Sequence, residues 1–327
     1  TGGGLLNEAD GVISGRNLAI GPQNSNYSVY DSTIANAGTI NGTVNLASNS
    51  IYGYGNSYIA LRGGILNGDL ILGSSDTLAV SLPVSSGAMF DGFNGTVHGN
   101  GASLRYMAAT DASATLGRLA GFGAISYEVA QDATLFLRAP ATQSDSLVLA
   151  GQGTVELAAN FNFAEDGLLN IVDGIRLPGE NYNNSALLVR SKGALTAIRS
   201  ATGNYPSYGA MVVLGYENSF INDGTLTFQN FAISPYSYVA AISRGREVTN
   251  NGVILVDGAA AISGAGHVYN NGLVTEFESG TTSVGVVASY LTNNGTISMN
   301  GRAVVADFNS TNIINNGVLR SKNGIAI

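Results

Sequence analysis

The amino-acid sequence predicts an all-β protein, a right-handed parallel β-helix (β-solenoid) with three short strands in each coil of about 22 residues and with inserted loops. Three observations lead to this fold class: a recurring Asn-Gly phrase, short apolar runs between the phrases, and an unusual composition. Glycine accounts for 44 of the 327 residues, and charged residues make up only 11%. Ordinary proteins contain about 7% glycine and about 25% charged residues. The excess of glycine and the shortage of charge in this chain suit tight turns and neutral stacked surfaces.

The phrase occurs five times in the last third of the chain, and each copy begins a new unit. Its glycines stand at positions 224, 252, 272, 295 and 317, which gives steps of 28, 20, 23 and 22 residues. Each unit holds three apolar runs separated by Asn, Gly, Asp and Ser, which are turn residues, with glycine expected to supply positive φ. Runs this short with no helix between them are typical of strands that pair from coil to coil, about 4.8 Å apart.

The asparagines of the phrase are expected to pair with the asparagines of neighbouring coils, side-chain amide to side-chain amide. Such pairing satisfies polar groups that are costly to bury at a bend. Because the phrase recurs in every coil and a catalytic site does not, we interpret these positions as structural turns. They are Asn222, Gly224, Asn250, Gly252, Asn270, Gly272, Asn293, Gly295, Asn315 and Gly317.

Alternation after each glycine predicts which side chains point into the core, since every second residue of a strand lies on the same face. The predicted inward residues are Leu226, Phe228, Ile254, Val256, Ile297 and Met299. In the coil that starts at Gly272, the same register would direct Glu276 into the core, which is an expensive burial. We therefore expect a one-residue slip there that buries Leu273 and Phe277 instead.

Because a repeat array has no size limit of the ordinary kind, residues 1–327 are expected to form a single elongated domain. It would have looser coils over 1–73, degenerate coils over 74–200 and regular Asn-Gly coils over 201–327. Both ends of the sequence are interpreted as cuts through such an array, so we expect a fragment of a longer protein.

The charge pattern argues against several classes of partner. The net charge is −8, and the 14 basic residues are scattered apart from the pairs Arg244/Arg246 and Arg190/Lys192. Nucleic acid and anionic lipid are therefore not expected to bind. The chain has no cysteine, so no disulfide or thiolate metal site is expected, and no cofactor or metal is predicted. The nonapeptide of calcium-binding β-rolls is also missing, although calcium stays open.

The sequence does not indicate an enzyme. The two histidines, His98 and His267, are far apart in the sequence, and no Gly-x-Ser-x-Gly motif is present. A polysaccharide lyase or hydrolase on this fold is the alternative, because such enzymes use paired carboxylates. The acids to weigh are Glu165, Asp166, Asp173, Glu180, Glu276 and Glu278. A column of acids with a basic residue on adjacent coils would be needed, and the five regular coils do not show one.

Tyrosines in the inserted loops are the candidate binding residues: Tyr52, Tyr54, Tyr58, Tyr205, Tyr208, Tyr236 and Tyr238. Tyrosine has a rigid amphipathic ring that buries much area at little entropic cost, so it is frequent at binding hot spots. The other interpretation is that these rings fold back and pack against the side of the solenoid.

The copies of the phrase at Asn293–Ile297 and Asn315–Leu319, together with the stretch Leu147–Leu157, resemble the passenger domains of Gram-negative autotransporters. This resemblance implies a fragment of a longer passenger, located at the cell surface (outer membrane) or secreted, whose precursor includes an outer-membrane barrel. It further implies an adhesin for cell–cell aggregation, biofilm formation or host attachment. Its partners would be a host surface protein or glycan, or the same protein on a neighbouring cell. A toxin-type passenger that acts on host membranes is a further alternative.

Overall fold

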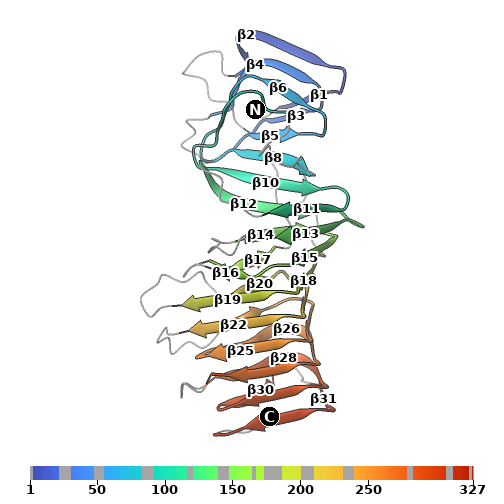
Figure 1. Cartoon of the computed structure of the whole chain (residues 1–327), viewed down its shortest axis with the longest axis vertical. Helices are drawn as coiled ribbons and strands as arrows, with labels where there is room; N and C mark the ends of the chain where they lie inside the picture. The colour runs from blue at the N-terminus through green and yellow to red at the C-terminus, as the bar shows by residue number, and fades with distance from the viewer. Residues whose placement is uncertain are drawn as a thin grey trace. The chain divides into compact units, whose positions relative to one another are not determined.

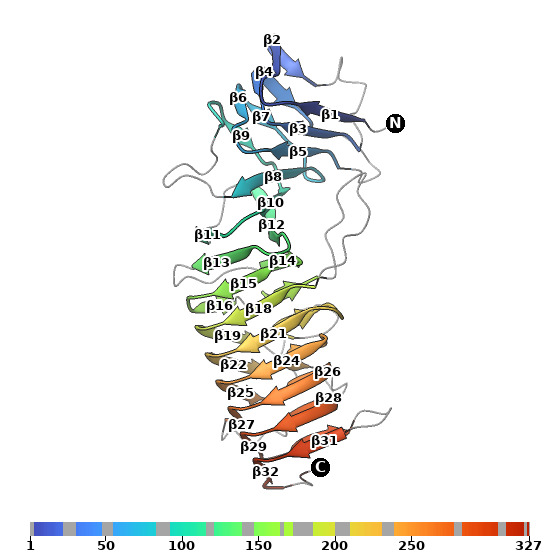
Figure 2. The same ribbon diagram turned by 90° about the vertical axis from the view of Figure 1, so that its right-hand side faces the viewer.

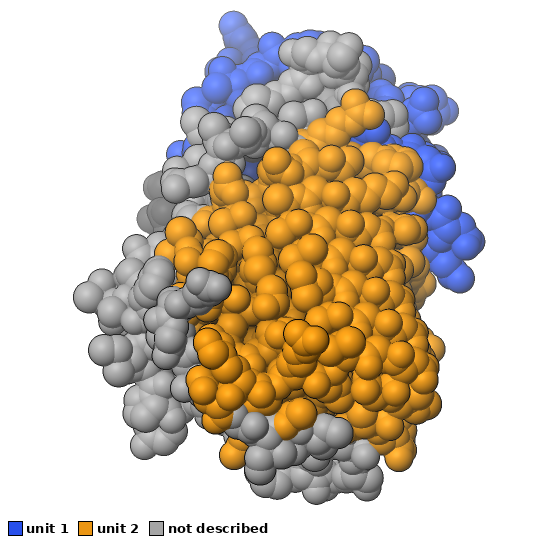
Figure 3. Space-filling model, turned by 60° about the horizontal axis from the view of Figure 1, so that its bottom comes forward, with its two compact units in different colours: residues 1–114, 118–133, 175–183 blue, residues 115–117, 134–174, 184–327 orange. Residues whose placement is uncertain are grey.

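The computed structural model describes residues 3–21, 31–47, 55–82, 92–115, 121–138, 147–163, 167–172, 186–199, 210–230, 239–277, 283–306, 312–323 and 326. These residues form 32 β-strands and no helix. The chain divides into two compact units, which are described one at a time (Figure 3). Unit 1 comprises residues 1–114, 118–133 and 175–183, and unit 2 comprises residues 115–117, 134–174 and 184–327. Within both units strands of successive coils pair in parallel, which confirms the predicted β-solenoid.

Unit 1 contains two parallel sheets (Figure 1). The first has the order β1 (Gly4–Asn7), β3 (Thr33–Asn36), β5 (Ser57–Ala60), β8 (Thr77–Leu82), β10 (Ala102–Ala108) and β12 (Phe122–Val129). The second has the order β2 (Val12–Ile20), β4 (Thr39–Asn45), β7 (Leu70–Ile71) and β9 (Val97–His98), and β6 (Ile65–Asn67) also pairs with β4. Strand β11 (Ala112–Thr115) precedes β12 in the chain. Inward side chains such as Ile40, Leu70 and Leu104 fill the space between the sheets as one buried core.

Unit 2 has three parallel faces, and its strands stack side by side from coil to coil (Figure 2). Face A consists of β14 (Leu147–Gly151), β17 (Leu169–Ile171), β20 (Val212–Leu214), β23 (Ala240–Ser243), the first parts of β26 (Ala260–Asn270) and β28 (Val284–Asn293), and β30 (Arg302–Ala306). Face B consists of β13 (Thr134–Arg138), β15 (Thr154–Leu157), β18 (Leu188–Ser191), β21 (Ser219–Asn222), β24 (Glu247–Asn250), the later parts of β26 and β28, and β31 (Asn312–Asn315).

Face C consists of β16 (Phe161–Phe163), β19 (Ala194–Arg199), β22 (Thr225–Asn230), β25 (Val253–Asp257), β27 (Leu273–Glu276), β29 (Thr296–Met299) and β32 (Val318–Ser321). In the regular coils the chain passes through faces B, C and A in turn. Each coil therefore contributes three strands, as the sequence predicts.

Alternation along the strands of face C builds the core of unit 2. Leu226 pairs with Ile254, which pairs with Val274, which pairs with Ile297, so apolar side chains stack in a column through four coils. All six predicted inward residues are buried, with exposed fractions of 0% for Leu226, Phe228, Ile254, Val256 and Ile297 and 2% for Met299. Burial of this continuous column supplies the main favourable term for stacking the coils.

The expected slip at Glu276 is wrong. The pairing of β27 continues without a shift, so Glu276 lies opposite Val256, while Leu273 and Phe277 stay half-exposed. Glu276 is the last residue of its strand, and its Oε1 accepts a hydrogen bond from the backbone N–H of Asn300 in the next coil. Burying the carboxyl group at the end of the strand, where a backbone N–H donates to it, costs less free energy than shifting the register of the whole strand. Burial raises the pKa of Glu276, and the negative charge of Asp257 raises it further.

The glycines of the phrase are required for a different reason from the expected one. None of them has a positive φ. Instead, a Cβ added to Gly252 would lie 2.0 Å from the carbonyl oxygen of Gly224 in the preceding coil. A Cβ added to Gly272 or to Gly317 would likewise lie 2.0 Å from the carbonyl oxygen of the phrase glycine in the preceding coil. Close approach between coils, rather than a left-handed turn, therefore excludes side chains at these positions.

Candidate binding face

Of the seven candidate tyrosines, only Tyr58 lies among the described residues, and its assignment as a loop binding residue is wrong. Tyr58 belongs to β5, and its side chain is 1% exposed. Its hydroxyl accepts a hydrogen bond from Asn36 Nδ2 at 3.1 Å, because the residue paired with Asn36 in this coil is Ala60, which has no amide. Burial raises the pKa of Tyr58 to about 12, and it is a core residue. Six predicted residues lie outside the described ones: Tyr52, Tyr54, Tyr205, Tyr208, Tyr236 and Tyr238.

The first asparagine of each phrase forms what we name the inner ladder, at the corner between faces B and C. In it the Nδ2 of each asparagine donates to the Oδ1 of the next one along the chain, over distances of 2.7–2.8 Å. The same Nδ2 atoms also lie 3.2–3.3 Å from a backbone carbonyl oxygen of the next coil. These paired amides satisfy the side-chain polar atoms of the buried members Asn250, Asn270 and Asn293. At the start of the ladder, Asn222 Oδ1 is buried and has no partner among the described residues. The ladder consists of Asn222, Asn250, Asn270, Asn293 and Asn315.

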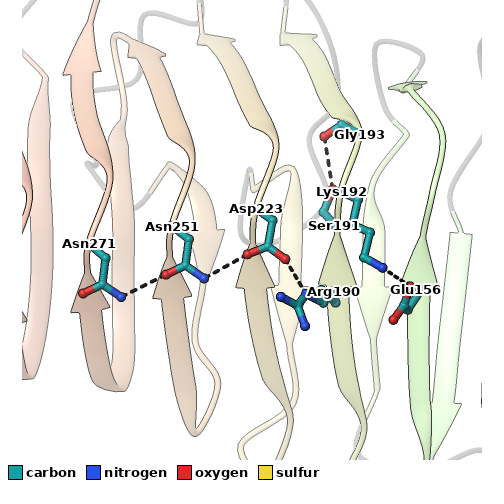
Figure 4. A network of polar contacts seen from close by, with 8 residues as sticks. All are labelled: Glu156, Arg190, Ser191, Lys192, Gly193, Asp223, Asn251 and Asn271. Atoms are coloured by element: carbon teal, nitrogen blue, oxygen red, sulfur yellow. Dashed lines mark hydrogen bonds and ion pairs between the residues drawn. The ribbon is translucent and has the colours of Figure 1, made fainter.

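The second residue of each phrase forms an outer ladder, which is exposed and runs in the opposite direction. Each Nδ2 donates to the Oδ1 of the preceding coil over 2.9–3.0 Å. The ladder begins at Asp223, whose ionised carboxylate accepts hydrogen bonds but does not donate them. Asp223 therefore sets the direction of the amides that follow it, and Figure 4 shows the first two, Asn251 and Asn271. The ladder consists of Asp223, Asn251, Asn271, Asn294 and Asn316.

Two ion pairs extend the outer ladder toward earlier coils (Figure 4). Arg190 Nε donates to the second carboxylate oxygen of Asp223, and Lys192 Nζ lies 2.5 Å from a carboxylate oxygen of Glu156. Desolvation alone would raise the pKa of Asp223. Hydrogen bonds from Arg190 and Asn251, together with the positive charges of Arg190 and Lys192, outweigh that effect and lower the pKa. Exposed pairs of this kind stabilise a fold by about 0–1 kcal/mol, so their main effect is on the surface chemistry of this corner.

An aromatic patch, formed by His267, Tyr269 and Tyr290, lies on the outer side of face B. Parallel pairing places His267 opposite Tyr290, and their rings stack with centroids 4.5 Å apart and an angle of 22°. The hydroxyl of Tyr269 lies 3.5 Å from Nδ1 of His267. His267 is exposed, and Tyr290 is 44% exposed. These rings come from regular strands, β26 and β28, and were not among the tyrosines that the sequence analysis proposed.

Sequence reasoning missed this patch, although the signal was present. His267 and Tyr290 each stand three residues before the first asparagine of a phrase, and Tyr269 stands one residue before it. Both offsets are odd, so these side chains point away from the core in which that asparagine is buried. Alignment of the phrases would have placed the three rings together on one outer surface.

The acids considered for polysaccharide cleavage fall mainly outside the described residues: Glu165, Asp166, Asp173, Glu180 and Glu278. Glu276 lies near Asp257, which is 2% exposed. In the part of the chain that the structure describes, no three acidic or histidine side chains are grouped so as to hold a metal ion. The same residues contain no helix long and apolar enough to cross a membrane.

Comparison of the chain with protein families, with curated proteins and with solved structures gives no match. The inference of function therefore rests on the fold and on the chemistry of its surface.

Proposed function

We propose that this chain is an adhesin-like passenger domain of a Gram-negative autotransporter, located at the cell surface or secreted, which acts by binding and not by catalysis. The observation that carries the proposal is the exposed aromatic patch on a rigid stack of parallel strands. An outer-membrane barrel in the same precursor belongs to this proposal, as the resemblance of the repeat phrase to such passengers implies.

The patch has the physical properties of a binding hot spot. Its side chains project from strands that are hydrogen-bonded on both sides, so their backbone is ordered before a partner arrives. The stack of His267 on Tyr290 restricts the rotamers of both rings, which lowers the entropy lost on binding. Aromatic side chains with polar atoms at their edges dominate the energy of many interfaces.

The surroundings of the patch extend the same surface. Thr249 and Thr292 lie on either side of Tyr269 in the neighbouring column of face B, and Ile314 follows in the next coil with 58% exposure. Glu247 lies opposite His267 in the preceding coil and places one charge at that edge of the patch. Thr249, Thr292 and Ile314 carry no charge, and hydroxyl and methyl groups lose less free energy than charged groups when they are desolvated. Suitable partners are a host surface protein or glycan, or a second copy of this protein on a neighbouring cell, with aggregation, biofilm formation or host attachment as the result.

The test replaces two rings of the patch and measures adhesion. Bacteria that display the full protein with Tyr269→Thr and Tyr290→Thr are expected to adhere to cultured host cells, or to settle by aggregation, at least about fivefold less than wild type. Threonine favours strands, so the circular dichroism spectrum should be unchanged. Ile198→Thr, at a residue of face C with 48% exposure, is the matched control and should adhere like wild type. Adhesion of the double variant equal to that of the control would refute the proposal.

A further inference from the structure

The bend between β29 and β30, at the corner between faces C and A, contains an Asn-Gly pair that belongs to neither ladder. Its residues are Asn300 and Gly301. An asparagine side chain before a glycine is open to attack by the next backbone nitrogen, because glycine has no Cβ to hinder the approach. Whether this attack proceeds in a folded protein depends on how the side chain and the nitrogen are held.

The reaction is a cyclisation that releases ammonia. The backbone nitrogen of Gly301 attacks Cγ of Asn300, and an N–Cγ bond forms while the Cγ–Nδ2 bond breaks. The proton of the Gly301 nitrogen leaves with Nδ2 as ammonia, and a succinimide ring remains. Water then adds to one of the two ring carbonyls, which gives aspartate or isoaspartate. The net change consumes one water molecule and converts one amide into one carboxylic acid.

The outer ladder holds its Asn-Gly pairs in a way that opposes this reaction. Asn271 Nδ2 donates to Asn251 Oδ1, and Asn271 Oδ1 accepts from Asn294 Nδ2, so the amide is fixed at both ends. The backbone N–H of Gly272 donates to the carbonyl oxygen of Asn250 over 3.0 Å. Ring closure at Asn271 would break all three hydrogen bonds. The pairs that begin at Asn251 and Asn294 are held in the same manner.

The pair at Asn300 lacks these restraints. Among the described residues, neither the side chain of Asn300 nor the backbone N–H of Gly301 has a hydrogen-bond partner. The contacts of the bend use other atoms. The N–H of Asn300 donates to Glu276 Oε1, and its carbonyl oxygen accepts from the N–H of Asn323. The carbonyl oxygen of Gly301 accepts from Ser321 Oγ over 2.6 Å. The backbone is thus anchored on both sides of two unbound reacting groups.

Exposure and hydrogen bonding give opposite orders of reactivity for these pairs. Asn251, Asn271 and Asn294 are exposed, whereas Asn300 is half-exposed. Access of water alone would make the ladder asparagines react first. Water enters only after the ring has closed, however, so the hydrogen bonds that closure must break decide the order. Asn300 is then the most reactive of the four.

We propose that Asn300 is a site of spontaneous deamidation, and that the outer ladder protects the more exposed asparagines of unit 2 from the same reaction. This inference concerns a covalent modification and does not depend on the proposed function. The product places a new carboxylate on the residue that binds Glu276, whose pKa the negative charge of Asp257 already raises. Repulsion between like charges therefore destabilises the bend after the reaction.

The experiment follows each pair by peptide mapping and mass spectrometry while the purified chain is kept in neutral buffer. In the folded protein, Asn300 is expected to deamidate at least about tenfold faster than Asn251, Asn271 or Asn294. The same chain unfolded in guanidinium chloride is the control, because there no pair keeps its hydrogen bonds. The four rates should then agree within about threefold. A rate advantage of Asn300 that is no larger in the folded than in the unfolded chain would overturn the inference.

Asn271→Ala tests whether the ladder causes the protection. The variant removes one side-chain hydrogen bond from Asn251 and one from Asn294, at an exposed position. Deamidation of both should become at least about twofold faster, while the rate at Asn300 stays that of wild type. Unchanged rates at Asn251 and Asn294 would show that the ladder does not protect them.

Two further variants test the effect of the new charge. Asn300→Asp carries the charge of the product on an ordinary backbone and should melt at a lower temperature than wild type in neutral buffer. Asn300→Gln is the neutral control, which should melt like wild type and show no fast deamidation at this position. Equal melting temperatures for the two variants would refute the predicted repulsion in the bend.

Discussion

At the residue scale, the central asparagines of the inner ladder are held by hydrogen bonds on both sides. Asn270 is one example: its Oδ1 accepts from Asn250, and its Nδ2 donates to Asn293, both through buried contacts. Replacing one member therefore leaves two buried partners without their hydrogen bonds. In the outer ladder the same loss is compensated by water, because Asn271 and its partners are exposed.

This difference gives a prediction. Asn270→Ala should lower the free energy of unfolding by about 2 kcal/mol or more, since it orphans a buried acceptor and a buried donor. Asn271→Ala, the matched variant of the outer ladder, should cost less than about 1 kcal/mol. Chemical denaturation of the two variants beside wild type measures both values. Equal losses would mean that burial does not distinguish the two ladders.

At the element scale, strand β27 shows that a charged residue is tolerated at an inward register position when it ends the strand. The carboxylate of Glu276 accepts from the backbone of Asn300, and its pKa is raised above the ordinary value of 4.5. A raised carboxyl pKa means that folding favours the protonated form. Its contribution to stability is fully present below the unfolded pKa and is lost as pH rises through the folded pKa.

Glu276→Gln should therefore be more stable than wild type at pH 7, while below about pH 4 the two proteins should be nearly equal. Glutamine keeps an oxygen that accepts from the Asn300 N–H but does not ionise. Thermal melting between pH 4 and pH 8 measures the difference in stability between the two proteins. Burial also raises the pKa of Asp76, but both proteins contain Asp76, so its contribution cancels in the difference. A stability difference that does not change with pH would contradict this account of Glu276.

The elements also show what the sequence predicts and what it does not. The coil period and the inward residues from Leu226 to Met299 follow from local spacing, so the fold class was predictable. The role of Tyr58 as the hydrogen-bond partner of Asn36 was not predictable. It depends on Ala60, the residue paired with Asn36 in the next strand, which has no side-chain amide. The register of β27 depended on a donor 24 residues away, and the aromatic patch formed between residues 23 positions apart. Such features need the alignment of coils with one another, which local patterns do not supply.

At the scale of the whole molecule, the central claim concerns the outer side of face B in unit 2. There the two ion pairs at Arg190 and Lys192 precede the asparagine ladders along the coils, and the aromatic patch lies in later coils. A repeat fold holds all these groups at fixed spacing, so one continuous surface is available for binding. If this surface binds the partner, its exposed side chains become inaccessible in the complex.

The two histidines of the chain provide the most direct measurement. Both are exposed, and only His267 belongs to the aromatic patch, whereas His98 lies in β9 of unit 1. Modification with diethyl pyrocarbonate, followed by mass spectrometry, reports the accessibility of each imidazole in the free protein and in the protein bound to the cells to which it adheres. The account predicts that binding slows the modification of His267 and leaves that of His98 unchanged. Equal modification of His267 in the free and the bound protein would contradict it.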